Sequence, residues 1–254
     1  VDEAAARAAG LISASAKSAV MRVDNTTRLA PGANRKSVRI HSKEPVKLGS
    51  LVIGDILRMP FGCARGQPIG LMVQIGQTVA RLWALTIPHP DKSRKLTELA
   101  TQDIIEGVHH DKINQLTLHV KDSGCKLSSN PDITGKTVPA NVDCNANNNG
   151  NVGCSYAETA AASYGKAFND AGELCLVSDA RLVTVSERAN PSAGGGVIAL
   201  LFSKDAISIW FWSHASKTMP QNIEQGSPDM ATWGKPSATW PRSSCDIPTY
   251  FADQ

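Results

Sequence analysis

The stretch Asp103-Ile104-Ile105-Glu106-Gly107 sets two acids inside an apolar, β-branched segment, and Asn114-Gln115-Leu116-Thr117-Leu118-His119 follows it closely. A carboxylate within such a strand is costly to bury unless it is paired or used. Because side chains alternate along a strand, Asp103 and Glu106, three positions apart, should point to opposite faces. One extra residue, a β-bulge at Ile104-Ile105, would bring both acids to one face, and bulges are enriched beside active sites. If the two acids act together, the strand is therefore expected to carry a bulge at this point.

Two carboxyl groups on one rigid sheet face suit glycoside hydrolysis. One protonates the leaving oxygen, and the other acts at the anomeric carbon. The alternative for the same five residues is a solvated acidic edge of the sheet.

The stretch resembles the fungal endo-β-1,3(4)-glucanases of glycoside hydrolase family 16. Their pattern is Glu-Ile-Asp-Ile-Ile-Glu-Gly, followed by Asn-Gln-x-x-Leu-His and Gly-Cys. Further segments that are similar to the family, in the same order, are Val23–Thr27, Ser37–Lys43, Met59–Cys63, Trp210–Ser213, Ser227–Asp229, Trp233–Gly234 and Ser244–Ile247. The resemblance implies an enzyme that cleaves internal bonds of β-glucans with retention. We expect no cofactor, assign no metal-ligating residues and leave calcium binding open.

Carried over position by position, the resemblance makes Glu106 the acid/base and Asp103 the assisting acid. Thr101 stands where the family has its nucleophilic Glu, and a neutral hydroxyl cannot replace that carboxylate. Glu98 falls on the opposite face by strand alternation, so it is a poor substitute. We therefore expect impaired hydrolysis. The alternatives are a non-catalytic β-glucan-binding protein and a chain that does not fold stably.

Five further residues are predicted to bind the sugar. The resemblance places His119 near the acid/base, and packing is its alternative role. Asn114 and Gln115 could donate amide hydrogen bonds to sugar hydroxyls or could support the turn into the strand. Trp210 and Trp212 share one face of a strand. On a concave face they would stack on glucosyl rings, and on the other face they would belong to the core.

Short alternating or apolar segments, separated by Gly, Pro, Asn and Ser, predict an all-β protein. The expected strands are Ser37–Ser42, Leu51–Arg58, Gln102–Val108, Gln115–His119, Val197–Phe202 and Ile207–Trp212, with a helical turn within Ala4–Leu11. The pattern favours two packed antiparallel sheets, a jelly-roll β-sandwich of the concanavalin A-like type.

We expect one domain over residues 1–254, without the family's first and last strands. Residues 64–102 and 173–193 do not resemble the family, although matching segments flank both. Blocks that change this abruptly are typical of retained introns or frame slips in a gene model, and genuine divergence is the alternative.

The six cysteines and the sequon at Asn25 favour a secreted protein, although no signal peptide is present. Cys144 and Cys154 flank a polar, turn-prone loop that a disulfide would close. The family pattern implies a second bond between Cys125 and Cys245, while Cys63–Cys175 remains possible. The net charge of +3 and the lack of a long apolar run predict neither a nucleic-acid nor a membrane partner. We expect a monomer.

Overall fold

The computed structural model describes residues 1–15, 18–38, 40, 46–61, 74–75, 83–84, 100–107, 110–121, 123–148, 150–171 and 194–251. Most of 64–102, including Glu98, and all of 173–193, including Cys175, lie outside these ranges, as does Cys63.

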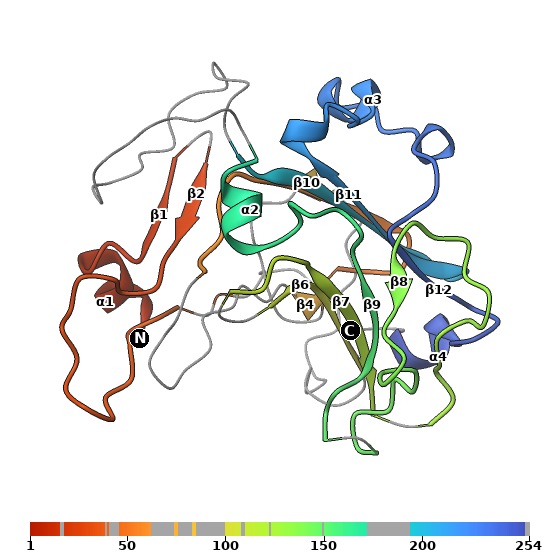
Figure 1. The fold of residues 1–254 in the computed structure, drawn as a ribbon, viewed down its shortest axis with the longest axis horizontal. Coiled ribbons are helices and arrows are strands. Elements are labelled where there is room, and N and C mark those ends of the chain that lie inside the picture. Colours follow the sequence, from red (N-terminus) through yellow and green to blue (C-terminus); the bar gives the residue numbers. More distant parts are fainter. Residues whose placement is uncertain are drawn as a thin grey trace.

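Two five-stranded antiparallel sheets lie face to face in the described part of the chain (Figure 1). The first has the order β12-β11-β10-β3-β5, formed by Ala238–Pro241, Ala206–Ser213, Gly196–Phe202, Ser50–Ile56 and Trp83–Ala84. The second has the order β4-β6-β7-β9-β8, formed by Gln74–Ile75, Ala100–Glu106, Gln115–Val120, Cys154–Ala157 and Lys136–Thr137. This arrangement confirms the all-β sandwich.

Shorter elements surround the sheets. A separate hairpin pairs β1 (Ile12–Ala14) with β2 (Ala19–Met21). The helices are α1 (Glu3–Ala8), α2 (Gly165–Asn169), α3 (Gln221–Glu224) and α4 (Ile247–Phe251), with 3-10 turns η1 (His214–Ser216) and η2 (Met230–Thr232). No helix among the described residues is long and apolar enough to cross a membrane.

Strand alternation separates the core from a polar face. Leu116, Leu118 and Val120 of β7 are buried and pack in one cluster with Ile198 and Leu200 of β10. The residues between them on β7 are polar and face the other way. The core therefore lies between the sheets, and the second sheet turns a polar face away from it.

The predicted strands agree with the structure, with one exception. Residues 37, 38 and 40 are not in a strand, and the rest of Ser37–Ser42 lies outside the described ranges. The Asp24 amide donates to the carbonyl of Lys36 at 2.8 Å, a loop contact that forms no ladder. An alternating pattern makes a strand only when a neighbouring strand takes up its backbone groups.

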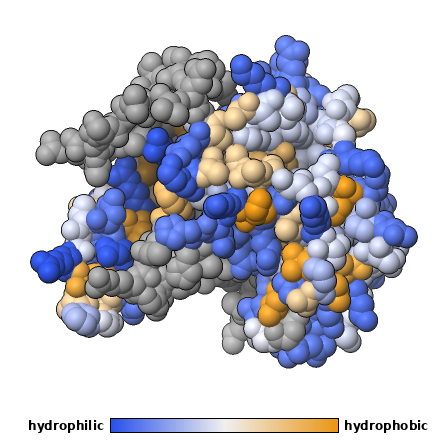
Figure 2. Space-filling view, viewed as in Figure 1, coloured by the Kyte–Doolittle hydropathy of each residue, from blue (hydrophilic) through white to orange (hydrophobic). Residues whose placement is uncertain are grey.

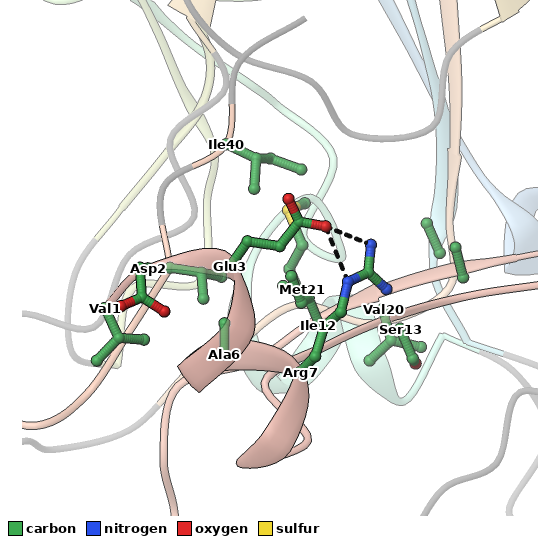
Figure 3. Close-up of a pocket in the computed structure, with 13 residues that line it drawn as sticks. Val1, Asp2, Glu3, Ala6, Arg7, Ile12, Ser13, Val20, Met21 and Ile40 are labelled. Atoms are coloured by element: carbon green, nitrogen blue, oxygen red, sulfur yellow. Dashed lines mark hydrogen bonds and ion pairs between the residues drawn. The ribbon is translucent and has the colours of Figure 1, made fainter.

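The helical turn predicted near the N-terminus is α1. The Asp2 carboxylate caps it by accepting a hydrogen bond from the Ala5 amide at 2.8 Å. Glu3 and Arg7 form an ion pair one turn apart at 2.7 Å. Both line a pocket beside the β1–β2 hairpin, together with apolar residues such as Ile12, Val20, Met21 and Ile40 (Figure 3). None of the predicted site residues lines this pocket.

Both predicted disulfides are present. Cys144–Cys154 closes a loop with a sequence separation of 10, and Cys125–Cys245 joins residues 120 apart. All four cysteines are buried in the core between the sheets. The longer bond ties the segment after β7 to the segment before α4.

Candidate active site

The acids lie on β6, and its pairing with β7 confirms the predicted bulge. Asp103 is opposite Thr117, whereas Glu106 is opposite Gln115. Three steps along β6 therefore match two steps along β7, and the register shifts between the acids. The extra residue places Asp103 and Glu106 on the polar face of the second sheet.

Asp103 pairs with His119 on the neighbouring strand. The Nε2 atom of His119 lies 2.9 Å from Oδ2 of Asp103, and Asp103 is 1% exposed. The second carboxylate oxygen, Oδ1, is buried and has no hydrogen-bond partner in the part of the chain that the structure describes. A buried acceptor of this kind is costly, which is typical of a site that uses the group.

Glu106 is half-buried, and its carboxyl group is held by Thr117. The Thr117 hydroxyl donates to Oε2 of Glu106 at 2.9 Å. Burial, and next the negative charge of Asp103, raise the pKa of Glu106, while the Thr117 hydrogen bond and His119 act in the opposite direction. A carboxyl group with a raised pKa next to a second carboxylate suits a proton donor.

A chain of polar side chains extends from Glu106 across the sheet. The hydroxyl oxygen of Thr117 lies 3.0 Å from the hydroxyl oxygen of Ser155, which belongs to β9. Gln115 donates to both hydroxyls, at 3.3 Å and 3.2 Å. The half-buried Gln115 thus lies beside the acids as predicted, and its amide orients the hydroxyl that holds Glu106. Thr117 and Ser155 had no signal in the sequence beyond their alternation with apolar neighbours.

Asn114 is buried against the bulge and does not lie where its side chain could bind a sugar. It is 1% exposed, and its amide bonds the backbone of the bulge on both sides. Its Nδ2 donates to the Ile104 carbonyl at 2.8 Å, and its Oδ1 accepts from the Glu106 amide at 2.9 Å. Of the two roles considered from the sequence, these contacts match support of the strand. Burial with both amide atoms engaged leaves no group for a sugar hydroxyl.

Trp210 and Trp212 share one face of β11, but it is not the face that carries the acids. Ile207 and Ile209 of β11 pack between the sheets. The two tryptophans belong to a separate cluster on the outer side of the first sheet, where both contact Trp233 edge to face at 5.4 and 5.3 Å. The prediction of stacking on glucosyl rings beside the acids is therefore corrected. The segment that contains Trp233 covers the tryptophans, which form a second small core.

Position 101 lies opposite His119 in the register, two residues before Asp103. By strand alternation it belongs to the same face as Asp103. The position that the resemblance assigns to the nucleophile is thus adjacent to the pair of acids, and the chain has threonine there.

Removing the hydroxyl that holds Glu106 is expected to raise the pKa of Glu106 further. Thr117→Val keeps the shape of the side chain but deletes a hydrogen bond that favours the ionised carboxylate. Titration of ¹³C-labelled glutamate carboxyls by NMR, with the signal assigned through Glu106→Gln, measures this shift. Thr137→Val, at an exposed position on β8 of the same sheet, is the matched control and should leave the titration unchanged. A pKa of Glu106 that falls in Thr117→Val would contradict the geometry.

Among the described residues, no group of three or more His, Cys, Asp and Glu side chains is arranged to hold a metal ion. Hydrophilic residues cover much of the described surface on the side seen in Figure 2, with smaller hydrophobic patches between them.

An antiparallel sandwich with two carboxyl groups brought together by a bulge fits the jelly-roll class of glycosidase folds. The chain belongs to glycoside hydrolase family 16. A family model described as an XgeA-like, catalytic GH16 domain matches residues 1–66, 101–179 and 174–254.

Curated relatives agree with this family. A probable glycosidase of Schizosaccharomyces pombe is 29% identical over 246 residues, which are 96% of this chain and 47% of that protein. An endo-1,3(4)-beta-glucanase of Arthroderma benhamiae is 30% identical over 256 residues, 100% of this chain and 46% of that protein. The chain therefore spans about half the length of these relatives.

Solved structures show the same fold. Laminarinase 16A of Phanerochaete chrysosporium, with 6-O-glucosyl-laminaritriose in its donor and acceptor sites, superposes with a TM-score of 0.75 at 28% identity. The match covers 99% of this chain and 70% of that chain. An elongating GH family 16 beta-1,3-glucosyltransferase has a TM-score of 0.72 at 29% identity, covering 99% and 68%.

Proposed function

We propose that this chain carries the catalytic site of an endo-1,3(4)-β-glucanase that acts on β-glucans, with its hydrolytic step impaired by Thr101. The observation that carries the proposal is the bulge, which places Asp103 and Glu106 on one face. The relatives named for endo-1,3(4)-beta-glucanase activity and the laminarinase with bound β-glucan support the substrate class.

In a retaining mechanism Glu106 would donate its proton to the glycosidic oxygen as the bond to the anomeric carbon breaks. The raised pKa of Glu106 favours the protonated form that this step needs. Asp103, held by His119, would support the pair electrostatically. A carboxylate at position 101 would attack the anomeric carbon, and Glu106 would then remove a proton from the incoming water. Threonine at position 101 cannot attack the anomeric carbon in this way, because its hydroxyl is neutral and is a weak nucleophile without an adjacent base.

The second candidate function is β-glucan binding without cleavage. It is favoured by Thr101, because loss of the nucleophile removes the chemistry without removing the neighbouring polar face. The two candidates share a ligand and differ in turnover.

Two measurements on the purified chain test both candidates. Calorimetry with laminarin oligosaccharides should give heat of binding, and release of reducing ends from laminarin and lichenan should be slight or absent. Strong turnover that Glu106→Gln abolishes would overturn the proposed impairment and support the site. A folded chain that neither binds nor cleaves these glucans would contradict both candidates.

Other features of the proposal rest on single observations. We infer one domain and a secreted monomer, and the two disulfides support an oxidising compartment. Asn25 is exposed and is the proposed glycosylation site. The family matches leave residues 67–100 uncovered, so this segment departs from the family, whereas residues 173–193 fall within the matched ranges. An altered gene model is our proposed origin of the departure over 64–102. Sequencing the transcript across both anomalous segments would decide between that origin and divergence.

A further inference from the structure

The bulge is held by contacts from outside its own strand. An unsupported bulge leaves backbone groups without ladder partners. Here the Asn114 side chain spans it, with a hydrogen bond to the carbonyl of Ile104 on one side and from the amide of Glu106 on the other. The amide group thus supplies an acceptor and a donor where the neighbouring strand cannot.

Asn114 is itself fixed by its own backbone groups. Its amide donates to the hydroxyl of Ser163 at 3.0 Å, and its carbonyl accepts from the amide of Glu158 at 3.0 Å. Both Asn114 and Ser163 are 1% exposed. All four polar groups of Asn114 are therefore engaged, and its position depends on a residue 49 positions away in the chain.

The next residue along, Tyr164, holds the end of the bulged strand. Its buried hydroxyl donates to the carbonyl of Gly107 at 2.7 Å. A Cβ at Gly107 would lie 2.7 Å from the Tyr164 ring, so the close approach requires glycine. Tyr164 thus contacts the end of the bulged strand directly, at Gly107, and Ser163 contacts the bulge itself through Asn114.

We propose that Asn114 is a positioning residue: clamped by Ser163, it fixes the β-bulge and so keeps Glu106 on the face that carries Asp103. Without the extra residue in the register, Glu106 would return to the opposite face, where the hydrophobic core lies. The consequence for catalysis rests on the proposed function, whereas the positioning itself does not.

The coupling between the two acids tests the proposal without any activity. In the unaltered background, Asp103→Asn should lower the pKa of Glu106, because it deletes a negative charge on the same face. In an Asn114→Leu background this lowering should be lost, because Glu106 no longer shares a face with Asp103. NMR titration of the Glu106 carboxyl in all four proteins gives the coupling as a double-mutant cycle.

Asn222→Leu is the matched control. Asn222 also uses both amide atoms, donating to Thr232 at 2.7 Å and accepting from Trp233 at 2.9 Å, but it lies on the far side of the first sheet. Replacing Asn222 by leucine should leave unchanged the amount by which Asp103→Asn lowers the pKa of Glu106. A general loss of stability therefore cannot imitate the expected result.

Ser163→Ala gives a milder version, which keeps the proposal testable if Asn114→Leu does not fold. Ser163→Ala removes the hydroxyl that accepts the hydrogen bond from the Asn114 backbone amide. In this background Asp103→Asn should still lower the pKa of Glu106, but by less than in the unaltered protein. An undiminished effect in either folded variant would overturn the positioning role. A folded, unaltered chain that neither binds nor cleaves laminarin oligosaccharides would count against the proposed function alone, because the titrations depend on neither ligand nor turnover.

Discussion

Thr101→Glu is expected to raise hydrolysis of laminarin by about a thousand-fold, within the range that one positioned catalytic group contributes. Position 101 lies opposite His119 and two residues before Asp103, so a carboxylate placed there joins the face that carries both acids. It would supply the nucleophile that a neutral hydroxyl cannot provide. The measurement is the rate of release of reducing ends by the purified variant, compared with the unaltered chain at equal concentration.

Two further variants separate restored chemistry from other causes. Thr101→Gln has almost the same size as Thr101→Glu but no charge, and it should give no gain. Adding Glu106→Gln to Thr101→Glu should remove the gain, because no group would then protonate the leaving oxygen. If Thr101→Glu folds and binds laminarin oligosaccharides yet hydrolyses no faster, the missing carboxylate is not what limits this chain.

The second large effect concerns stability. Replacing Cys125 and Cys245 together by alanine is expected to lower the free energy of unfolding by about 5 kcal/mol, compared with about 3 kcal/mol for Cys144 and Cys154. The difference follows from loop length, since the first bond joins residues 120 apart and the second joins residues 10 apart. A longer closed loop removes more conformational freedom from the unfolded chain.

Guanidinium titration of the two double variants and the unaltered protein, without reductant, gives both losses. A loss of about 5 kcal/mol is comparable with the total stability of many domains, so the Cys125/Cys245 variant should be partly unfolded at 37 °C. Equal losses, or a larger loss for the short loop, would show that native contacts rather than chain entropy set the contribution of these bonds.

Local features of this protein could be predicted from the sequence because short-range rules govern them. Two acids three residues apart in an apolar strand need an extra residue to share a face, and the register between β6 and β7 has that residue. A polar loop between Cys144 and Cys154 can close on itself, and it does. The acid/base and nucleophile roles stay predictions, because they concern chemistry with a substrate.

Other features depended on contacts between distant parts of the chain. Strand alternation fixes that Trp210 and Trp212 share a face, but it does not say which face meets the second sheet. The structure turns Ile207 and Ile209 inward and covers the tryptophans with Trp233. Periodicity gives relative orientation, and only packing of the two sheets gives the absolute one.

The role of Asn114 at the site likewise depended on contacts between distant parts of the chain. From the sequence, a polar residue before a strand suits sugar binding and strand support equally well. Strand support is the role that Asn114 has in the structure, because its backbone amide donates to Ser163, 49 residues away, and its side-chain amide bonds the backbone on both sides of the bulge. The sequence by itself determined that the two acids could share a sheet face only through an extra residue between them, because side-chain alternation is a local property. Only the tertiary structure decided what holds them there, because a buried amide takes its role from the partners that folding brings to it.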